Sequence, residues 1–126
     1  MNLIVALLLF CSPNAYNFVQ SQNPVILVTP LSTSYALPPF ILLSAGEPHP
    51  ELTLVHESYH LWQHRQPEWQ SDLTLYGVDP FAKFRVELAA NDNPYMDEVR
   101  NCQDQHSIST TTPAWELAKY NVPDGN

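Results

Sequence analysis

The first half of the sequence lacks positive charge, because no Lys or Arg precedes Arg65. The whole chain has 5 Lys and Arg against 13 Asp and Glu, which gives a formal net charge of −8. A surface of that sign repels phosphate backbones, so we expect no direct nucleic-acid partner. Glycine is also scarce, with 3 residues, and the 12 prolines are spread along the chain, so no flexible or proline-rich linker divides it.

Cysteine is limited to Cys11 and Cys102, and the sequence therefore contains no Cys-x-x-Cys pair for a cysteine-based zinc site. The two thiols could form one disulfide in an oxidising compartment, and reduced thiols are an equal alternative. We expect them to be buried core thiols. The 126 residues, 44% of them hydrophobic, are enough for one folded domain with a modest core.

The N-terminus contains an unbroken apolar run, Leu3 to Phe10, which is too short to span a bilayer as a helix. A secretory signal is disfavoured, because no basic residue precedes the run and no small-residue cleavage pattern follows it. The composition permits strand or helix, and we expect a buried strand. Residues 1–24 would then be a docking arm that pairs with other protein subunits. This favours a component of a large assembly, such as a virus particle, over a secreted or envelope-associated protein.

Residues 25–126 are expected to form a single domain. Val25–Thr29 and Phe40–Ser44 are apolar, β-branched or aliphatic runs that follow prolines, and both predict strands. Asn14 to Pro24 is polar and broken, which is typical of a loop.

A helix is predicted from Pro50 to about Gln66. Pro50 suits the first helical position, Glu51 and Arg65 complement the helix dipole, and Pro67 ends the helix. Three further helices are expected: one from Asp79-Pro80 to about Asp92, one over Tyr95–Cys102 and one over Pro113–Tyr120. Strands and helices in separate runs indicate an α+β fold. We expect the aromatic residues to be core rather than substrate contacts: Trp62, Trp69, Phe81, Phe84 and Trp115.

The first of these helices contains the motif His-Glu-x-x-His, from His56 to His60. Residues four apart on a helix share one face, so both imidazoles can bind a single Zn²⁺. Glu57 is placed to take a proton from a metal-bound water. The alternative is that both histidines are ordinary polar residues on a solvated helix face.

A catalytic zinc needs a third protein ligand, and Glu87 on the second helix is the best candidate. The small Ala89 and Ala90 beside it would let the two helices approach closely. Glu87 could instead be a surface carboxylate paired with Lys83. The rival third ligands are Glu98, Asp92 and Asp97.

This motif, followed by a helix that carries a glutamate, resembles the gluzincin group of zinc metallopeptidases over residues 38–93. The resemblance implies a small zincin-like domain with His56, His60 and Glu87 as zinc ligands and Glu57 as general base. Asn91 stands where many members have an aspartate that orients the first histidine. Phe40–Ser44 would be the edge strand that pairs with substrate.

The resemblance also implies hydrolysis of a peptide or protein substrate by a zinc-activated water. The side chain that stabilises the oxyanion would be Tyr76, Tyr95, His106 or Arg100, and the sequence does not select among them. The alternative function is a structural component of a large assembly that retains the zinc site with little or no catalysis.

Overall fold

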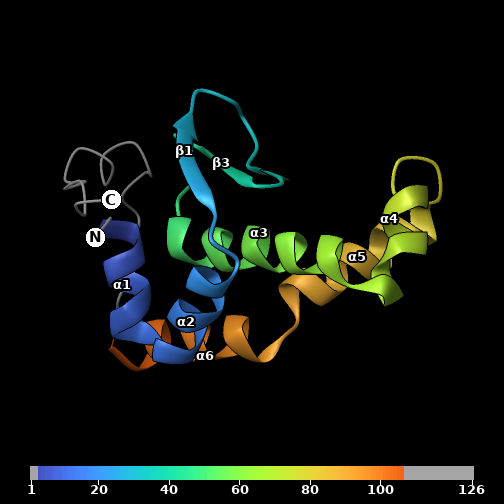
Figure 1. The fold of residues 1–126 in the computed structure, drawn as a ribbon. Coiled ribbons are helices and arrows are strands. Elements are labelled where there is room, and N and C mark those ends of the chain that lie inside the picture. Colours follow the sequence, from blue (N-terminus) through green and yellow to red (C-terminus); the bar gives the residue numbers. More distant parts are fainter. Residues whose placement is uncertain (1–2, 107–126) are drawn as a thin grey trace.

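Prolines open five of the helical segments in the computed structural model, which describes residues 3–106. These residues form an α+β fold in which a small sheet lies on one side of a central helix (Figure 1). The elements in chain order are α1 (Leu3–Cys11), α2 (Pro13–Ser21), β1 (Val25–Thr29), β2 (Tyr35–Leu37), β3 (Phe40–Ser44), α3 (Pro50–Arg65), a 3₁₀ turn (Pro67–Trp69), α4 (Gln70–Leu75), α5 (Pro80–Asn91) and α6 (Pro94–His106). The helix expected over Pro113–Tyr120 lies outside the described residues.

The sheet has the strand order β1-β3-β2, with β1 parallel and β2 antiparallel to β3. Both strands expected from the sequence are therefore confirmed. Phe40–Ser44 is the central strand, however, so the expectation that it forms the edge beside the motif helix is wrong. The edge is β2, a three-residue strand that pairs with the first half of β3 and is too short to show a pattern in the sequence.

Helix α1 occupies the run for which a strand was expected, and that expectation is wrong. Ile4, Val5 and Leu8 are at most 4% exposed and lie on one helical face, which packs against α2, α3 and α6. Because every residue of Leu3–Phe10 is apolar, the sequence has no periodicity that separates a helix from a strand. The segment belongs to the core of this chain and is not a free arm.

Helix α2 replaces the loop expected over Asn14 to Pro24. Ser12 caps it, since its Oγ accepts a hydrogen bond from the Ala15 backbone N–H at 3.1 Å, and Pro13 fills the first helical position. A cap followed by proline is a typical helix start. Burial of Phe18 and Val19 in the core further stabilises this helix, although the segment is polar in composition.

A disulfide joins Cys11, at the end of α1, to Cys102 in α6, with the two Cα atoms 5.3 Å apart. The expectation of two reduced core thiols is therefore wrong. The sequence could not decide the pairing, because only the packing of α1 on α6 brings the two residues together.

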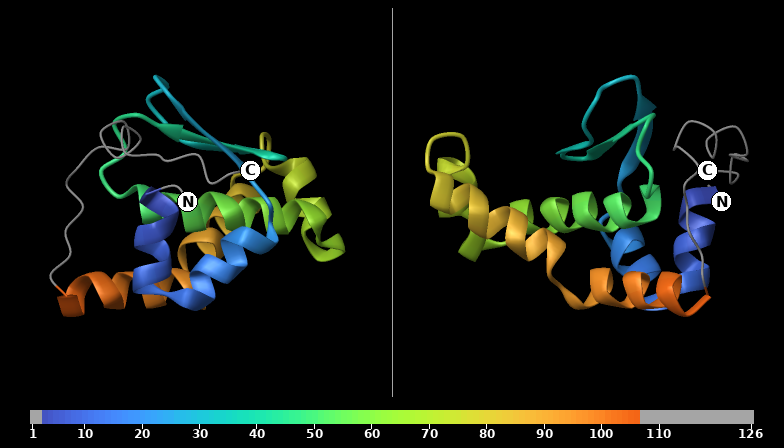
Figure 2. Two further views of the ribbon diagram at one scale, coloured as in Figure 1. Left: turned by 60° about the vertical axis from the view of Figure 1, so that its left-hand side comes forward. Right: turned by 180° about the vertical axis from the view of Figure 1, so that it is seen from behind.

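Helix α3 is the centre of the fold, as the views in Figure 2 show. Leu54, Val55 and Leu61 are at most 1% exposed between the sheet and the N-terminal helices. Helix α5 packs on α3 through small residues, Ala82 and Ala90 among them.

The expectation that the aromatic residues are core is wrong for two of them. Phe81 and Phe84 are 74% and 63% exposed, because α5 turns its small residues, not these rings, toward α3. Trp62 and Trp69 are partly exposed, and Trp115 lies outside the described residues. Within residues 3–106, none of the helices has both the length and the apolar character needed to cross a membrane.

Candidate metal centre

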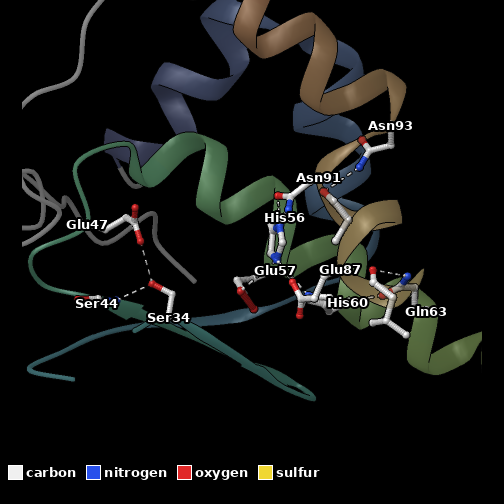
Figure 3. Close-up of polar contacts among 12 residues, drawn as sticks. Ser34, Ser44, Glu47, His56, Glu57, His60, Gln63, Glu87, Asn91 and Asn93 are labelled. Carbon is white, nitrogen blue, oxygen red and sulfur yellow. Dashed lines mark hydrogen bonds and ion pairs between the residues drawn. The ribbon is translucent and has the colours of Figure 1, made fainter. Parts of the chain in front are cut away.

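The two histidines of the motif lie on the face of α3 that looks toward the sheet and α5 (Figure 3). Their Nε2 atoms are 3.0 Å apart, and His60 is only 8% exposed. Glu57, which is 6% exposed, places its Oε1 3.8 Å from Nε2 of His56. The helical register that predicted the pair therefore brings both imidazoles to one point.

Glu87 approaches the same point from α5. Its Oε2 lies 3.1 Å from Nε2 of His56 and its Oε1 lies 3.3 Å from Nε2 of His60. The carboxylate thus faces both histidines while its side chain stays 33% exposed, and it is not paired with Lys83, whose ammonium lies over the Tyr76 ring at 5.7 Å. The Tyr76 hydroxyl donates a hydrogen bond to Oε1 of Glu87, so a second element holds the carboxylate in place.

Both imidazoles are held through their other nitrogen. Nδ1 of His56 donates to Oδ1 of Asn91 at 2.7 Å, and Nδ1 of His60 donates to Oε1 of Gln63 at 2.8 Å. The Gln63 amide in turn donates to the carbonyl of Val86 on α5 at 3.2 Å. Because Nδ1 carries a proton in both rings, Nε2 is the atom that is left without one when a ring is neutral, and its lone pair then faces the common point.

Sequence reasoning missed Gln63, which is 0% exposed. Its position three residues after His60 on one helix was the available signal, because such neighbours meet on the helix surface. Asn91 was expected beside His56, and it lies there.

The group His56, Glu57 and His60 could hold a metal ion, since their ligand atoms all lie within 4.8 Å of one another. Burial raises the pKa of Glu57 from 4.5 to about 7. Burial alone would lower the pKa of His60, but hydrogen bonds to Glu87 and Gln63 outweigh it and raise that pKa. Hydrogen bonds from His56 and His60 hold the pKa of Glu87 well below its usual range. In the metal-free protein, the Glu87 carboxylate therefore lies beside positive charge that His56 and His60 share.

Two clefts meet at this site. One has a volume of about 520 Å³ and extends past His60, Glu87 and Tyr76; the other, of about 330 Å³, extends toward Arg100. Both are lined by Ser34 and its neighbour Thr33, just before strand β2, and by His56 and Glu57. The two clefts share these four lining residues, and together they form the groove at His56 and Glu57.

The structure separates the four candidates for oxyanion stabilisation. Tyr76 lines the larger cleft, and Arg100 lines the smaller one while donating to the carbonyl of Asn91 at 2.9 Å. Tyr95 lies elsewhere, with its ring stacked on Phe18 at 4.3 Å between centroids. The side chain of His106, the last residue of α6, lies outside the described part of the structure.

Two of the rival third ligands have other polar partners. Glu98 accepts hydrogen bonds from Ser12 and Asn14 at the junction of α1 and α2. Asp97 pairs with Arg100 at 3.8 Å, and Asp92 follows the end of α5.

Comparisons with protein-family models, with curated proteins and with solved structures found no match for this chain. The interpretation of the site therefore depends on its own geometry.

Proposed function

We propose that this protein is a zinc-dependent hydrolase of peptide bonds, with His56, His60 and Glu87 as zinc ligands. The observation that carries the proposal is the spacing of their ligand atoms, at 3.0, 3.1 and 3.3 Å. Ligands about 2.1 Å from a tetrahedral ion lie about 3.4 Å from one another. The two imidazole nitrogens and the Glu87 carboxylate, which turns one oxygen to each of them, thus lie at about the separation of ligands on a tetrahedral zinc ion, and the fourth corner would be left for water.

The choice of Glu87 over Glu57 as the third ligand follows from the same distances. Glu87 has one oxygen near each histidine, whereas the ion-pair distance from Glu57 to His56 is 3.8 Å. Two neutral imidazoles and one carboxylate are a donor set that zinc favours. The amides of Asn91 and Gln63 orient the rings, as hydrogen-bonded partners of metal-binding histidines do.

A bound zinc ion supplies a water whose pKa falls to about 7 and a polarised substrate carbonyl. Glu57 supplies the base. Its own pKa of about 7 in the metal-free protein lets it accept a proton near neutral pH and return it to a leaving amine. Tyr76 lies in the larger cleft, where its hydroxyl can turn from Glu87 to a developing oxyanion.

The groove suits an extended peptide. Among residues 3–106, strand β2 pairs with β3 alone, so in this part of the chain its other edge offers unpaired backbone groups next to the histidines. An extended substrate can add to such an edge through main-chain hydrogen bonds. Because clefts lie on both sides of Glu57, the groove has room for chain on either side of the cleaved bond.

The second candidate function, a structural member of an assembly that keeps the zinc site, draws support from the outer face of the sheet. Val25, Leu27, Leu37 and Phe40 are between 41% and 56% exposed there. An apolar patch of this kind is typical of a surface that a partner covers. Both functions share the zinc ligands and differ in turnover.

The test combines metal analysis with hydrolysis of fluorescein-labelled casein. His56→Ala and Glu87→Ala should lose stoichiometric zinc, whereas Glu57→Gln should keep the zinc and lose hydrolysis. His49→Ala, which changes a histidine outside the two clefts, is the control and should keep both. Absence of zinc from the unaltered protein would remove the proposal, and zinc without casein hydrolysis would leave the structural function.

A further inference from the structure

A further cleft, of about 850 Å³, opens between α2, α3 and α6. Helices α2 and α6 lie on the other side of α3 from the sheet (Figure 1). The cleft is therefore separate from the candidate metal centre. Its volume is in the range of small-molecule sites, about 300–1,000 Å³. The proposed function assigns it no role.

One wall of the cleft is a row of aromatic rings from three helices. Trp62 and Tyr59 of α3 have centroids 5.0 Å apart, and Tyr59 lies 6.0 Å from Phe18 of α2. Phe18 in turn stacks on Tyr95 of α6 at 4.3 Å. Tyr59, Trp62 and Tyr95 remain partly exposed. Such rings offer flat apolar surfaces to a ligand that has a flat apolar face of its own.

The polar lining of the cleft is rich in acceptors. Gln22 is 5% exposed, and its Oε1 has no hydrogen-bond partner. Glu98 is held by hydrogen bonds from Ser12 and from Asn14 Nδ2, which lies 3.2 Å from its Oε1. A buried acceptor without a partner costs free energy, so a turn of the Gln22 side chain that brings Oε1 to the cleft lets a ligand donor remove that cost.

The charge of the lining narrows the ligand class. No Lys or Arg lines the cleft among residues 3–106, and Glu98 contributes a carboxylate. Phosphates and other anions are therefore disfavoured. A neutral ligand with hydroxyl groups satisfies the acceptors, and the C–H faces of sugar rings match the aromatic wall.

We propose that this cleft binds a neutral oligosaccharide. The sugar rings stack along Trp62, Tyr59 and Tyr95, and their hydroxyls donate to the Glu98 carboxylate and, once the Gln22 side chain has turned toward the cleft, to its Oε1. A proline-rich peptide also stacks on aromatic rows, but it lacks most backbone N–H donors and leaves these acceptors unmet.

The experiment uses the full oxidised chain and saturation-transfer NMR with four tetrasaccharides, made of β-1,4-glucose, α-1,4-glucose, mannose or N-acetylglucosamine. We expect at least one to bind, with its dissociation constant then measured by titration. Gln22→Leu, which replaces the unpartnered amide by an apolar group of similar size, should weaken binding roughly tenfold while keeping or raising the urea midpoint of unfolding. Asn17→Ala, on the exposed rim, should weaken it less, and Asn101→Ala, on α6 outside the cleft, should leave it unchanged.

Three results would overturn the proposal. The first is that none of the four sugars binds to the folded chain. The second is binding that Gln22→Leu and Asn17→Ala leave unchanged, and the third is binding of a proline decapeptide that competes with the sugar. Zinc content is measured in each variant, so a failure of the metal centre is recognised separately.

Discussion

Asn91 shows how a single side chain controls the candidate metal centre. Its Oδ1 accepts the Nδ1 proton of His56 at 2.7 Å. An amide orients the ring but adds no negative charge, so it would support the proposed zinc ion less than a carboxylate would.

We therefore expect Asn91→Ala to weaken zinc binding about 10- to 100-fold. Asn91→Asp should strengthen it, because a carboxylate raises the basicity of His56. Competition with a chromogenic chelator measures both constants. Asp92→Ala, at the neighbouring position, is the matched control; an equal loss in that variant would assign the effect to the end of α5 and not to the His56 contact.

The titrating groups of the site predict how the stability of the metal-free protein depends on pH. The pKa of Glu57 is raised to about 7 by burial, and that of His60 is also raised. The folded state therefore holds more protons than the unfolded state above pH 4.5, and the free energy of unfolding falls as the pH rises to about 8. The lowered pKa of Glu87 stabilises the folded state above about pH 4.5, and this stabilisation is lost as the pH falls below that value.

Urea denaturation with a chelator present, at several pH values from 5 to 8, measures this slope. Glu57→Gln should reduce it, since the amide does not titrate. Zinc should reverse the trend, because its ligands bind it only when deprotonated. A slope that Glu57→Gln leaves intact would show that other groups cause it.

At the scale of elements, α1 shows what burial does to a segment without a pattern. Leu8 is 0% exposed at the centre of the core, whereas Leu9, the next residue, is 37% exposed. We expect Leu8→Ala to lower the free energy of unfolding by about 2–5 kcal/mol, and Leu9→Ala by less than about 1 kcal/mol. Urea unfolding of the isolated chain measures both. Equal, small effects would restore the expectation of an N-terminal arm outside the core.

The helices that the sequence predicted well are those with clear start or stop signals. Pro50 and Pro67 bracket α3, and the cap Asp79 with Pro80 begins α5. Ser12 with Pro13 is the same start signal before α2. The residues after it are mostly polar, and for that reason the segment was predicted as a loop. Strand β2 could not be predicted, because its pairing with β3 defines it.

Within the site, helical spacing was enough to predict that His56 and His60 share a face. The approach of Glu87 needed only a second helix with small contact residues. The positions of Tyr95 and Gln63 depend on which face of each helix is buried, and that is decided by the whole core.

At the scale of the whole molecule, the disulfide joins the first helix to the last one described, across a sequence separation of 91 residues. In the chain-entropy treatment, a loop of that length stabilises the folded state by roughly 4–5 kcal/mol. We expect Cys11→Ser/Cys102→Ser and the reduced protein to lose that amount equally in urea unfolding. Unchanged midpoints after reduction would show that packing alone holds α1 on α6.

A stable disulfide is typical of proteins that mature in an oxidising compartment. Membership of a large assembly stays a prediction.

The disulfide can form only late in the synthesis of the chain, because its two cysteines are far apart in the sequence. Cys11 leaves the ribosome early and must wait as a free thiol until the segment around Cys102 has emerged. By then the strands, α3 and α5 have all been synthesised, so the side chains of the candidate metal centre are available before the bond can close. Under the proposed function, a chain that meets zinc at that stage brings its histidines together before oxidation, and zinc supplied during synthesis is then expected to raise the yield of correctly oxidised protein.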